Sequence, residues 1–177
     1  MKIRIRQENS SDAQAVFMLI EAAFANVEES DHREQFLVER LRKSDTFIPE
    51  LSLIAETEDG RVAGYVLLTK VDIVFGSGST PSLGVAPLAV LPEYQGQGIG
   101  GQLLREAHNI ASALGYGSAV LLGHKDYYPK FGYKRASAYG IRFPFDAPDE
   151  CCMAVELIPG ALKDVSGTVH YPAAFFE

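Results

Sequence analysis

The feature that most constrains the fold is a glycine-rich stretch between two apolar patterns. Four of the six residues from 96 to 101 are glycine, within the segment AVLPEYQGQGIGGQLLREA. An apolar run ends before this stretch, near Val90, and apolar residues at helical spacing follow from about Gly98 to Leu114. A strand, a glycine loop and a helix in this order gather backbone N–H groups at the start of the helix, where a phosphate can bind.

Two phosphate-binding motifs overlap in these glycines. GxGxxG, the dinucleotide fingerprint, begins at Gly96, and a different motif, QxxGxG, begins at Gln95. A dinucleotide loop follows its strand at once and needs an acidic residue about 20 residues later, at the tip of the next strand. Here LPEYQ separates the strand from the glycines, and Asp126 lies beyond the tip of the next strand, AVLL. The spacing therefore disfavours an NAD-type oxidoreductase.

The chain before the loop predicts strands and two helices. KIRIRQ (residues 2–7) alternates with period two and indicates a half-buried strand. Ser10, Ser11 and Asp12 offer N-caps for a helix through about Phe24, and a second helix is expected over about 31–43. Residues 51–75 predict two strands that turn at Asp59-Gly60. After a second turn, GSGSTP, we expect a strand over 82–90, in which Pro87 marks a bulge or a sheet edge.

The chain after the loop completes the predicted architecture. We expect a helix over about 98–114, a buried strand in SAVLLG, a short helical turn and a strand in HKDYYPKFGYKRA, and a last clear strand in ECCMAVELI. The apolar tail from residue 159 onward is expected to pack on the body. Only the strands that flank the helix have a crossover long enough for parallel pairing. The fold class is therefore mixed α/β, with a mostly antiparallel central sheet of six to seven strands and helices on both faces.

Composition excludes several classes of partner. The net charge of −7 argues against nucleic acid, which needs a basic face. No apolar run approaches the ~18 residues of a membrane span, and MKIRIRQENS lacks the apolar centre of a signal peptide, so we expect a cytoplasmic protein. The two cysteines, Cys151 and Cys152, are adjacent and poorly placed to bridge each other. Without a Cys/His cluster, no metal site is predicted.

The segment LAVLPEYQGQGIGGQLL resembles motif A of the GNAT superfamily of acetyl-CoA-dependent N-acetyltransferases. That motif is Q/R-x-x-G-x-G/A after a bulged strand, and Gln95, Gly98 and Gly100 match it in full. The element order also matches the family, and the tail is similar to the YhbS-like bacterial branch. The resemblance implies the GNAT acyl-CoA N-acyltransferase fold, a single domain over residues 1–177 and acetyl-CoA as co-substrate.

The resemblance also implies how acetyl-CoA binds. Its pyrophosphate would lie on N–H groups of the glycine loop, and its pantetheine arm would pair with the end of the preceding strand. The implied cofactor-binding residues are Leu88, Ala89, Val90, Gln95, Gly96, Gln97, Gly98, Ile99, Gly100, Gly101 and Tyr128.

Two groups are implied for the chemistry. A backbone N–H of Leu88 or Ala89 would polarise the thioester carbonyl like an oxyanion donor. DYYPKFGY resembles the family's Y-x-x-x-G-[FY] segment, and Tyr128 holds the position of its usual general acid, which protonates the leaving thiolate. The alternative for Tyr128 is an aromatic ring that packs under the cofactor. We expect Tyr127 to face the core and His124 to lie at the surface.

The general base and the acceptor are left open. Some family members carry a Glu on the strand before motif A, but SLGVAPLAV has no acid; the base candidates by region are Glu21, Glu28, Glu29 and Asp72. In the family the acceptor lies between the loops that correspond to ANVEESDH and ASAYGIRFPFDAPDE. These predict either a small amine with an apolar portion or a peptide N-terminus.

Two hypotheses from different classes follow. The leading one is an N-acetyltransferase that transfers the acetyl group of acetyl-CoA to a primary amine by direct attack in a ternary complex. The alternative is a catalytically weak module of the same fold that binds acyl-CoA as a sensor or interaction partner. A homodimer is possible, since dimers are common in the family.

Overall fold

The computed structural model describes residues 1–177 and divides into two compact units. Unit 1 comprises Met1–Leu68 and Ala86–Ala107, and unit 2 comprises Thr69–Val85 and His108–Glu177. Strands β3 (Val62–Phe75) and β4 (Gly78–Val90) and helix α3 (Ile99–Ala113) contribute residues to both. By hydrogen-bonded neighbours the strands run β1-β2-β3-β4-β5-β8-β6, and β9 pairs with β3 and β7. None of the helices combines the length and the apolar character needed to cross a membrane.

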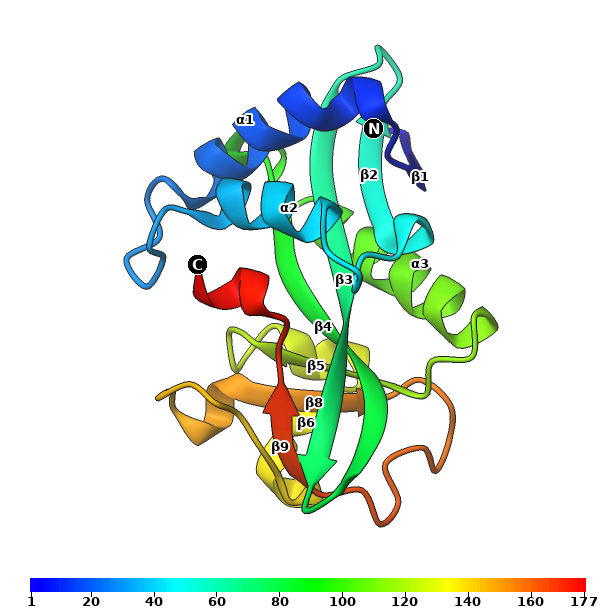
Figure 1. Cartoon of the computed structure of the whole chain (residues 1–177). Helices are drawn as coiled ribbons and strands as arrows, with labels where there is room; N and C mark the ends of the chain where they lie inside the picture. The colour runs from blue at the N-terminus through cyan, green and yellow to red at the C-terminus, as the bar shows by residue number, and fades with distance from the viewer. The chain divides into compact units, whose positions relative to one another are not determined.

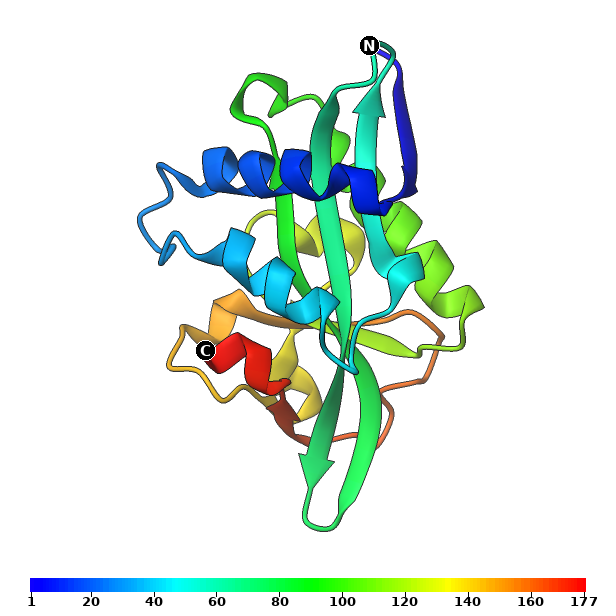
Figure 2. The same cartoon turned by 45° about the horizontal axis from the view of Figure 1, so that its top comes forward.

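Unit 1 is built on an antiparallel ladder of β1 (Ile3–Gln7), β2 (Ser52–Thr57) and the first half of β3. The predicted hairpin between β2 and β3 is confirmed, with the N–H of Gly60 donating to the carbonyl of Thr57 at 2.9 Å. Helices α1 (Ala13–Phe24) and α2 (Glu34–Arg42) cross one face of these strands, and α3 lies on the other (Figures 1 and 2). Helices on both faces were expected from the sequence.

A 3-10 turn, Ser10–Asp12, leads into α1, and Asn9 caps that turn with its side-chain oxygen, which accepts the N–H of Ser11 at 2.9 Å. Asp12, one of the three predicted candidates, is the N-cap residue of α1, but its side chain makes no capping bond to this helix. The carboxylate of Asp12 reaches back to the N–H of Asn9 at 2.7 Å and also accepts from the guanidinium of Arg6 at 2.8 and 2.9 Å. The hydrogen bonds from Arg6 hold the pKa of Asp12 below its ordinary value of 3.8.

A partly buried polar network ties the elements of unit 1 together. The carboxylate of Glu8, just after β1, accepts from Nε and Nη2 of Arg42 in α2 at 3.0 and 2.9 Å. The Ser52 hydroxyl donates to the same carboxylate at 2.5 Å and lies 2.7 Å from the hydroxyl of Tyr65. Tyr65 is fully buried, and burial raises the pKa of its phenol. Every charge and hydroxyl in this network therefore has a partner, as buried polar groups require.

Unit 2 contains the parallel pair that the sequence predicted. β4 runs parallel to β5 (Ser118–Leu122), with Leu83 opposite Ala119 and Gly84 opposite Val120. Pro87 comes after these paired positions, so its missing N–H breaks no bond of this ladder. Although β4 lies between β3 and β5, Pro87 lies beyond the ladder with β5, which agrees with the predicted local edge, while the bulge stays a prediction.

Short strands complete the sheet and were partly missed. β5 pairs antiparallel with β8 (Cys152–Glu156), which also pairs with β6 (Lys134–Arg135). The tail holds a further strand, β9 (Gly167–His170), antiparallel to β3 and parallel to β7 (Ile141–Arg142). The prediction of a single parallel pair is therefore wrong, because the chain between β7 and β9 is also long enough to cross over. The sheet has nine strands, more than the six to seven expected.

Several 3-10 turns join these elements. They are Ser10–Asp12, Pro49–Leu51, Pro92–Tyr94, Tyr128–Phe131, Ala136–Tyr139, Asp149–Cys151 and Ala173–Phe176.

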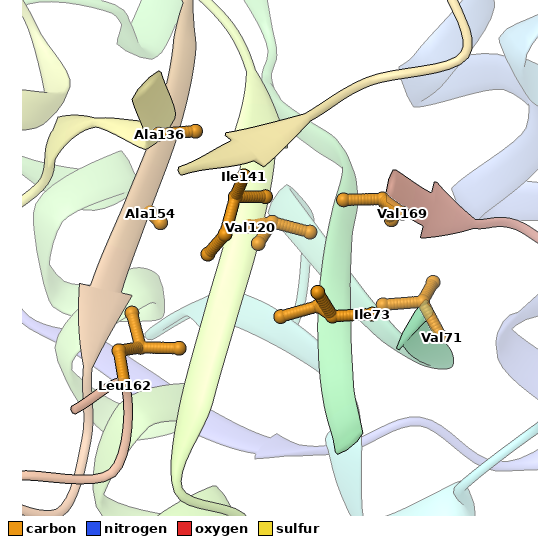
Figure 3. Close-up of a cluster of buried hydrophobic side chains, with 8 residues drawn as sticks. All are labelled: Val71, Ile73, Val120, Ala136, Ile141, Ala154, Leu162 and Val169. Atoms are coloured by element: carbon orange, nitrogen blue, oxygen red, sulfur yellow. The ribbon is translucent and has the colours of Figure 1, made fainter. Parts of the chain in front are cut away.

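The core of unit 2 explains why the tail folds back. Eight buried apolar side chains from β3, β5, β8, β7, β9 and the segments between them gather in one cluster (Figure 3). Leu162 and Val169, both from the tail, belong to it. Burial of these side chains stabilises the tail on the strands, at roughly 1.5–3 kcal/mol for a fully buried large aliphatic side chain.

Candidate functional site

The glycine loop adopts a backbone that only glycine takes without strain. After the 3-10 turn Pro92–Tyr94, Gly96 has φ +77° and Gly98 has φ +81°. A Cβ built on either residue meets no heavy atom within 4 Å, and residues 95–98 are exposed. These glycines are therefore required by the turn, not by crowding, and they leave an open backbone surface.

Hydrogen bonds hold the loop at the end of β4. The N–H of Leu91 donates to the carbonyl of Ala63 in β3 at 2.9 Å, and the side-chain amide of Gln95 donates to the carbonyl of Val90 at 3.0 Å. Gln95 therefore has a local role: its side chain closes the loop on the strand that precedes it. The same hydrogen bond holds Gln95 in place directly before Gly96, the first glycine of the loop.

Helix α3 begins directly at the glycines. The carbonyl of Gly98 accepts the N–H of Gln102 at 3.1 Å, so Gly98 is the first residue to bond into the helix. The N–H groups at the start of a helix have no partner within it, and the positive end of the helix dipole lies there. Gly64 of β3 lets this turn lie close, because a Cβ there would fall 2.9 Å from Leu103 and 3.0 Å from Ile99. The first turn of α3 is thus fixed against the strand, and its N–H groups can bind an anion.

The predicted oxyanion donors lie just before the loop. Ala89 is buried, and Leu88 and Val90 are half-buried, at the last positions of β4. The loop and these three residues belong to unit 1. Residues 95–98 are exposed, whereas Ile99, Gly100 and Gly101 are buried at the start of α3. The binding roles of the residues from Leu88 to Gly101 stay predictions.

Tyr128 belongs to unit 2 and is enclosed by aromatic rings. Its ring packs edge-to-face on Tyr127 at 5.0 Å and on Tyr133 at 5.7 Å between centroids. A Cβ on Gly123 would fall 2.9 Å from Cδ2 of Tyr128 and closer still to Cε2, so the ring lies against bare backbone at the end of β5. Burial, and then the neighbouring Tyr127, raise the pKa of Tyr128. The phenol is therefore protonated at neutral pH, as a proton donor must be.

The remaining candidates are mostly at the surface. Glu21, Glu28, Glu29 and Asp72, the acids proposed by region as bases, are all exposed. His124 is exposed, and its Nδ1 accepts the N–H of Asp126 at 3.1 Å.

The structure also places the aromatic ring of Tyr127 and the two cysteine thiols. Tyr127 is half-buried. The ammonium group of Lys130 lies over its ring, 4.6 Å from the ring centroid, in a cation–π contact. Cys151 and Cys152 are free thiols, and Cys152 is the buried one.

Two polar groups in the structure were not predicted from the sequence. Glu34, at the start of α2, accepts a hydrogen bond from Ser30 through Oε1, while its Oε2 is buried with no hydrogen-bond partner. Nε2 of His108 in α3 lies 2.8 Å from the hydroxyl of the buried Tyr133. His108 lies on the helix that apolar spacing predicted. Tyr133 follows 25 residues later, so no short sequence pattern indicates that the two side chains meet.

Comparisons with known proteins identify the family. A family model described as an acetyltransferase (GNAT) domain matches residues 4–136. The chain is 34% identical over 171 residues to the protein named uncharacterized N-acetyltransferase YhbS in Escherichia coli strain K12, which covers 97% of each chain.

Solved structures agree with this assignment. The E. coli YhbS structure in complex with CoA has a TM-score of 0.89 and 31% identity, and the match covers 100% of this chain and 93% of that one. A GNAT family acetyltransferase from Brucella melitensis in complex with acetyl-CoA has a TM-score of 0.80 and 34% identity, with 98% of each chain covered. The resemblance read from motif A is therefore confirmed, and the dinucleotide reading of the glycines is not supported. This chain belongs to the GNAT family of acetyltransferases.

Proposed function

We propose that this protein transfers the acetyl group of acetyl-CoA to a primary amine by direct attack in a ternary complex. The observation that carries the proposal is the open glycine loop at the start of α3, with Gly96 and Gly98 at positive φ and no heavy atom within 4 Å of either Cβ position. The CoA and acetyl-CoA bound in the two related structures support this choice of ligand. Both units would act together as one domain over residues 1–177.

The residues of the loop fit a pyrophosphate. N–H groups from Gly96 to Gly101 would bind its oxygens, helped by the positive end of the α3 dipole, whereas the N–H of Gln95 already donates to the carbonyl of Pro92 at 3.3 Å. Backbone groups of Leu88 and Val90 would pair with the pantetheine amides, and Ile99 would line the loop. When bound, acetyl-CoA supplies an acetyl group already activated as a thioester. No side chain of the loop needs to be charged for this binding, which fits an exposed backbone surface in an acidic protein.

The proposed chemistry needs one carbonyl donor and one acid. The neutral amine attacks the carbonyl carbon, a C–N bond forms, and the C–S bond breaks with its electron pair passing to sulfur. The N–H of Leu88 or Ala89 would stabilise the charge that develops on the carbonyl oxygen. The Tyr128 hydroxyl would give its proton to the sulfur, and solvent would take the excess proton of the amine and reprotonate the phenolate.

The acceptor is proposed only as a class. The two candidates are a small amine with an apolar portion and a peptide N-terminus. We also propose that the protein acts in the cytoplasm and forms a homodimer. The exposed positions of Glu21, Glu28, Glu29 and Asp72 support a base that acts through water.

Thermal unfolding with acetyl-CoA, CoA and NAD added separately tests the ligand. A ligand that binds only the folded state at 100 times its Kd stabilises it by about 2.7 kcal/mol, so both CoA species should raise the midpoint and NAD should not. Thiol release over a panel of amines and peptides then tests turnover. A shift with CoA but no turnover would favour the sensor module, and no shift with either CoA species would refute the proposal.

Replacing Tyr128 with phenylalanine tests the acid. The ring packing on Gly123 is kept and only the hydroxyl is lost, so acetyl-CoA should bind as before. We expect kcat to fall about 100-fold or more, in the range for a lost general acid, with little change in the KM for acetyl-CoA. An unchanged kcat would assign Tyr128 the packing role instead.

A further inference from the structure

Tyr128 is packed against its neighbours on several sides. One of these neighbours, Tyr133, is hydrogen-bonded to His108. Bare backbone at Gly123 faces one part of the ring, and Tyr127 meets it edge-on. The ring of Tyr133 meets it at 73° with 5.7 Å between centroids. Tyr133 is 2% exposed, so its ring is enclosed by the protein where it packs against Tyr128.

Tyr133 is anchored at its far end by His108. The Tyr133 hydroxyl lies 2.8 Å from Nε2 of His108, and the two rings are tilted by 42° with centroids 5.5 Å apart. Burial lowers the pKa of His108 to about 4 and raises the pKa of Tyr133, so both groups are neutral at pH 7. The phenol, the stronger acid of two neutral groups, donates to the imidazole. A single hydrogen bond of this kind fixes the tilt of the Tyr133 ring.

We infer that His108 and Tyr133 are positioning residues that hold the phenol of Tyr128 in the orientation needed for proton transfer. The contacts run from Nε2 of His108 to the Tyr133 hydroxyl and from the Tyr133 ring to the Tyr128 ring. The inference rests on the proposed acid role of Tyr128. Neither residue touches substrate; each acts through its neighbour. Breaking the hydrogen bond frees the Tyr133 ring, and the ring of Tyr128 then samples orientations that do not reach the sulfur.

Three variants separate positioning from folding. His108→Leu leaves the Tyr133 hydroxyl buried without a partner, while His108→Gln places an amide that can still bind it. Tyr133→Phe removes the hydroxyl and keeps the ring, and it serves if the leucine variant does not fold. Because a misplacement of about 1 Å can reduce the rate by about 100-fold, we expect His108→Leu and Tyr133→Phe to lower kcat about tenfold with the KM for acetyl-CoA unchanged. His108→Gln should recover most of that loss.

A double-mutant cycle tests the route of the effect. If His108 acts through Tyr128, His108→Leu should lower kcat in the wild-type background and have no further effect in Tyr128→Phe. A loss of the same factor in both backgrounds would overturn the inference. The matched control is Ser118→Ala, which removes a different buried hydroxyl pair of unit 2, the 2.7 Å contact with Ser82. That variant should lose comparable stability and keep kcat.

A measurement on the unliganded protein makes the test independent of activity. With 13C-labelled tyrosine, NMR reports the flip rate and chemical shift of the Tyr128 ring. We expect slow flipping in the wild type and in His108→Gln, and faster flipping in His108→Leu and Tyr133→Phe. Unchanged ring dynamics in both of the latter would overturn the inference. If Tyr128→Phe leaves kcat unchanged while the ring dynamics respond as expected, the proposed acid role fails and the positioning contact stands.

Discussion

Replacing Gly98 with alanine separates two reasons for a glycine in the loop. The residue has φ +81°, and nothing lies within 4 Å of a Cβ built on it, so a methyl group there causes backbone strain but no clash. An L-residue in this region costs about 1–2 kcal/mol, and the lower entropy of unfolded alanine offsets about 0.4–1 kcal/mol of it. We therefore expect the free energy of unfolding to fall by about 1 kcal/mol.

Gly60 is a matched control for this strain. It has φ +84°, its Cβ position is equally open, and it lies in the hairpin between β2 and β3. Urea denaturation should give Gly60→Ala and Gly98→Ala the same loss of stability within experimental error. Calorimetric titration with CoA should give different results, because only the methyl group of Gly98→Ala lies where the pyrophosphate is proposed to approach. One lost hydrogen bond to a charged group, about 1.5–3 kcal/mol, would raise the Kd by roughly tenfold to a hundredfold.

Asparagine at position 98 completes the test. Asparagine tolerates positive φ better than alanine, so Gly98→Asn should regain stability. It still carries a Cβ, so CoA binding should remain weak. If Gly98→Asn binds CoA as tightly as the wild type, close approach to the backbone is not what the glycine provides, and the argument is refuted.

Two further predictions concern the charged groups of unit 1. Arg42→Leu leaves the Glu8 carboxylate, 8% exposed, without its cation, and the free energy of unfolding measured in urea should fall by about 3 kcal/mol. Adding Glu8→Leu should recover most of that loss. Equal losses in the single and double variants would contradict this expectation. Because hydrogen bonds from Arg6 hold the pKa of Asp12 below 3.8, its contribution to stability is complete above that value and is lost as pH falls through the lower, folded pKa. Between pH 6 and 2, Asp12→Asn should therefore lose less stability than the wild type, and parallel pH profiles would disprove the assignment.

Patterns that repeat within a few residues were predictable from the sequence. Asp59-Gly60 marked the hairpin because its conformational demand is local, and α3 was recognised from apolar spacing over four turns. β7 and β9 were missed because strands of two and four residues show too little alternation to detect. They form through pairing with distant segments, as between Asp72 and His170 in β3 and β9.

The candidate site also contains features that short sequence patterns predict and features that they do not. The glycine loop is encoded by residue type, since positive φ at Gly96 and Gly98 selects glycine. The anchoring of Tyr133 by His108 joins residues 25 positions apart, on a helix and after a turn, and no spacing rule relates them. The acceptor also stays open, because loops that select substrates vary without changing the fold.

The place of β8 in the sheet has a consequence for synthesis. β8 lies between β5 and β6, although both precede it in the chain. A chain emerging from the ribosome therefore exposes the edge of β5 that pairs with β8, from Ser118 to Leu122, before β8 has been made. An apolar strand with an unpaired edge is a template for aggregation. A ribosome that pauses between the two strands prolongs this exposure, and a chain cut there keeps it permanently.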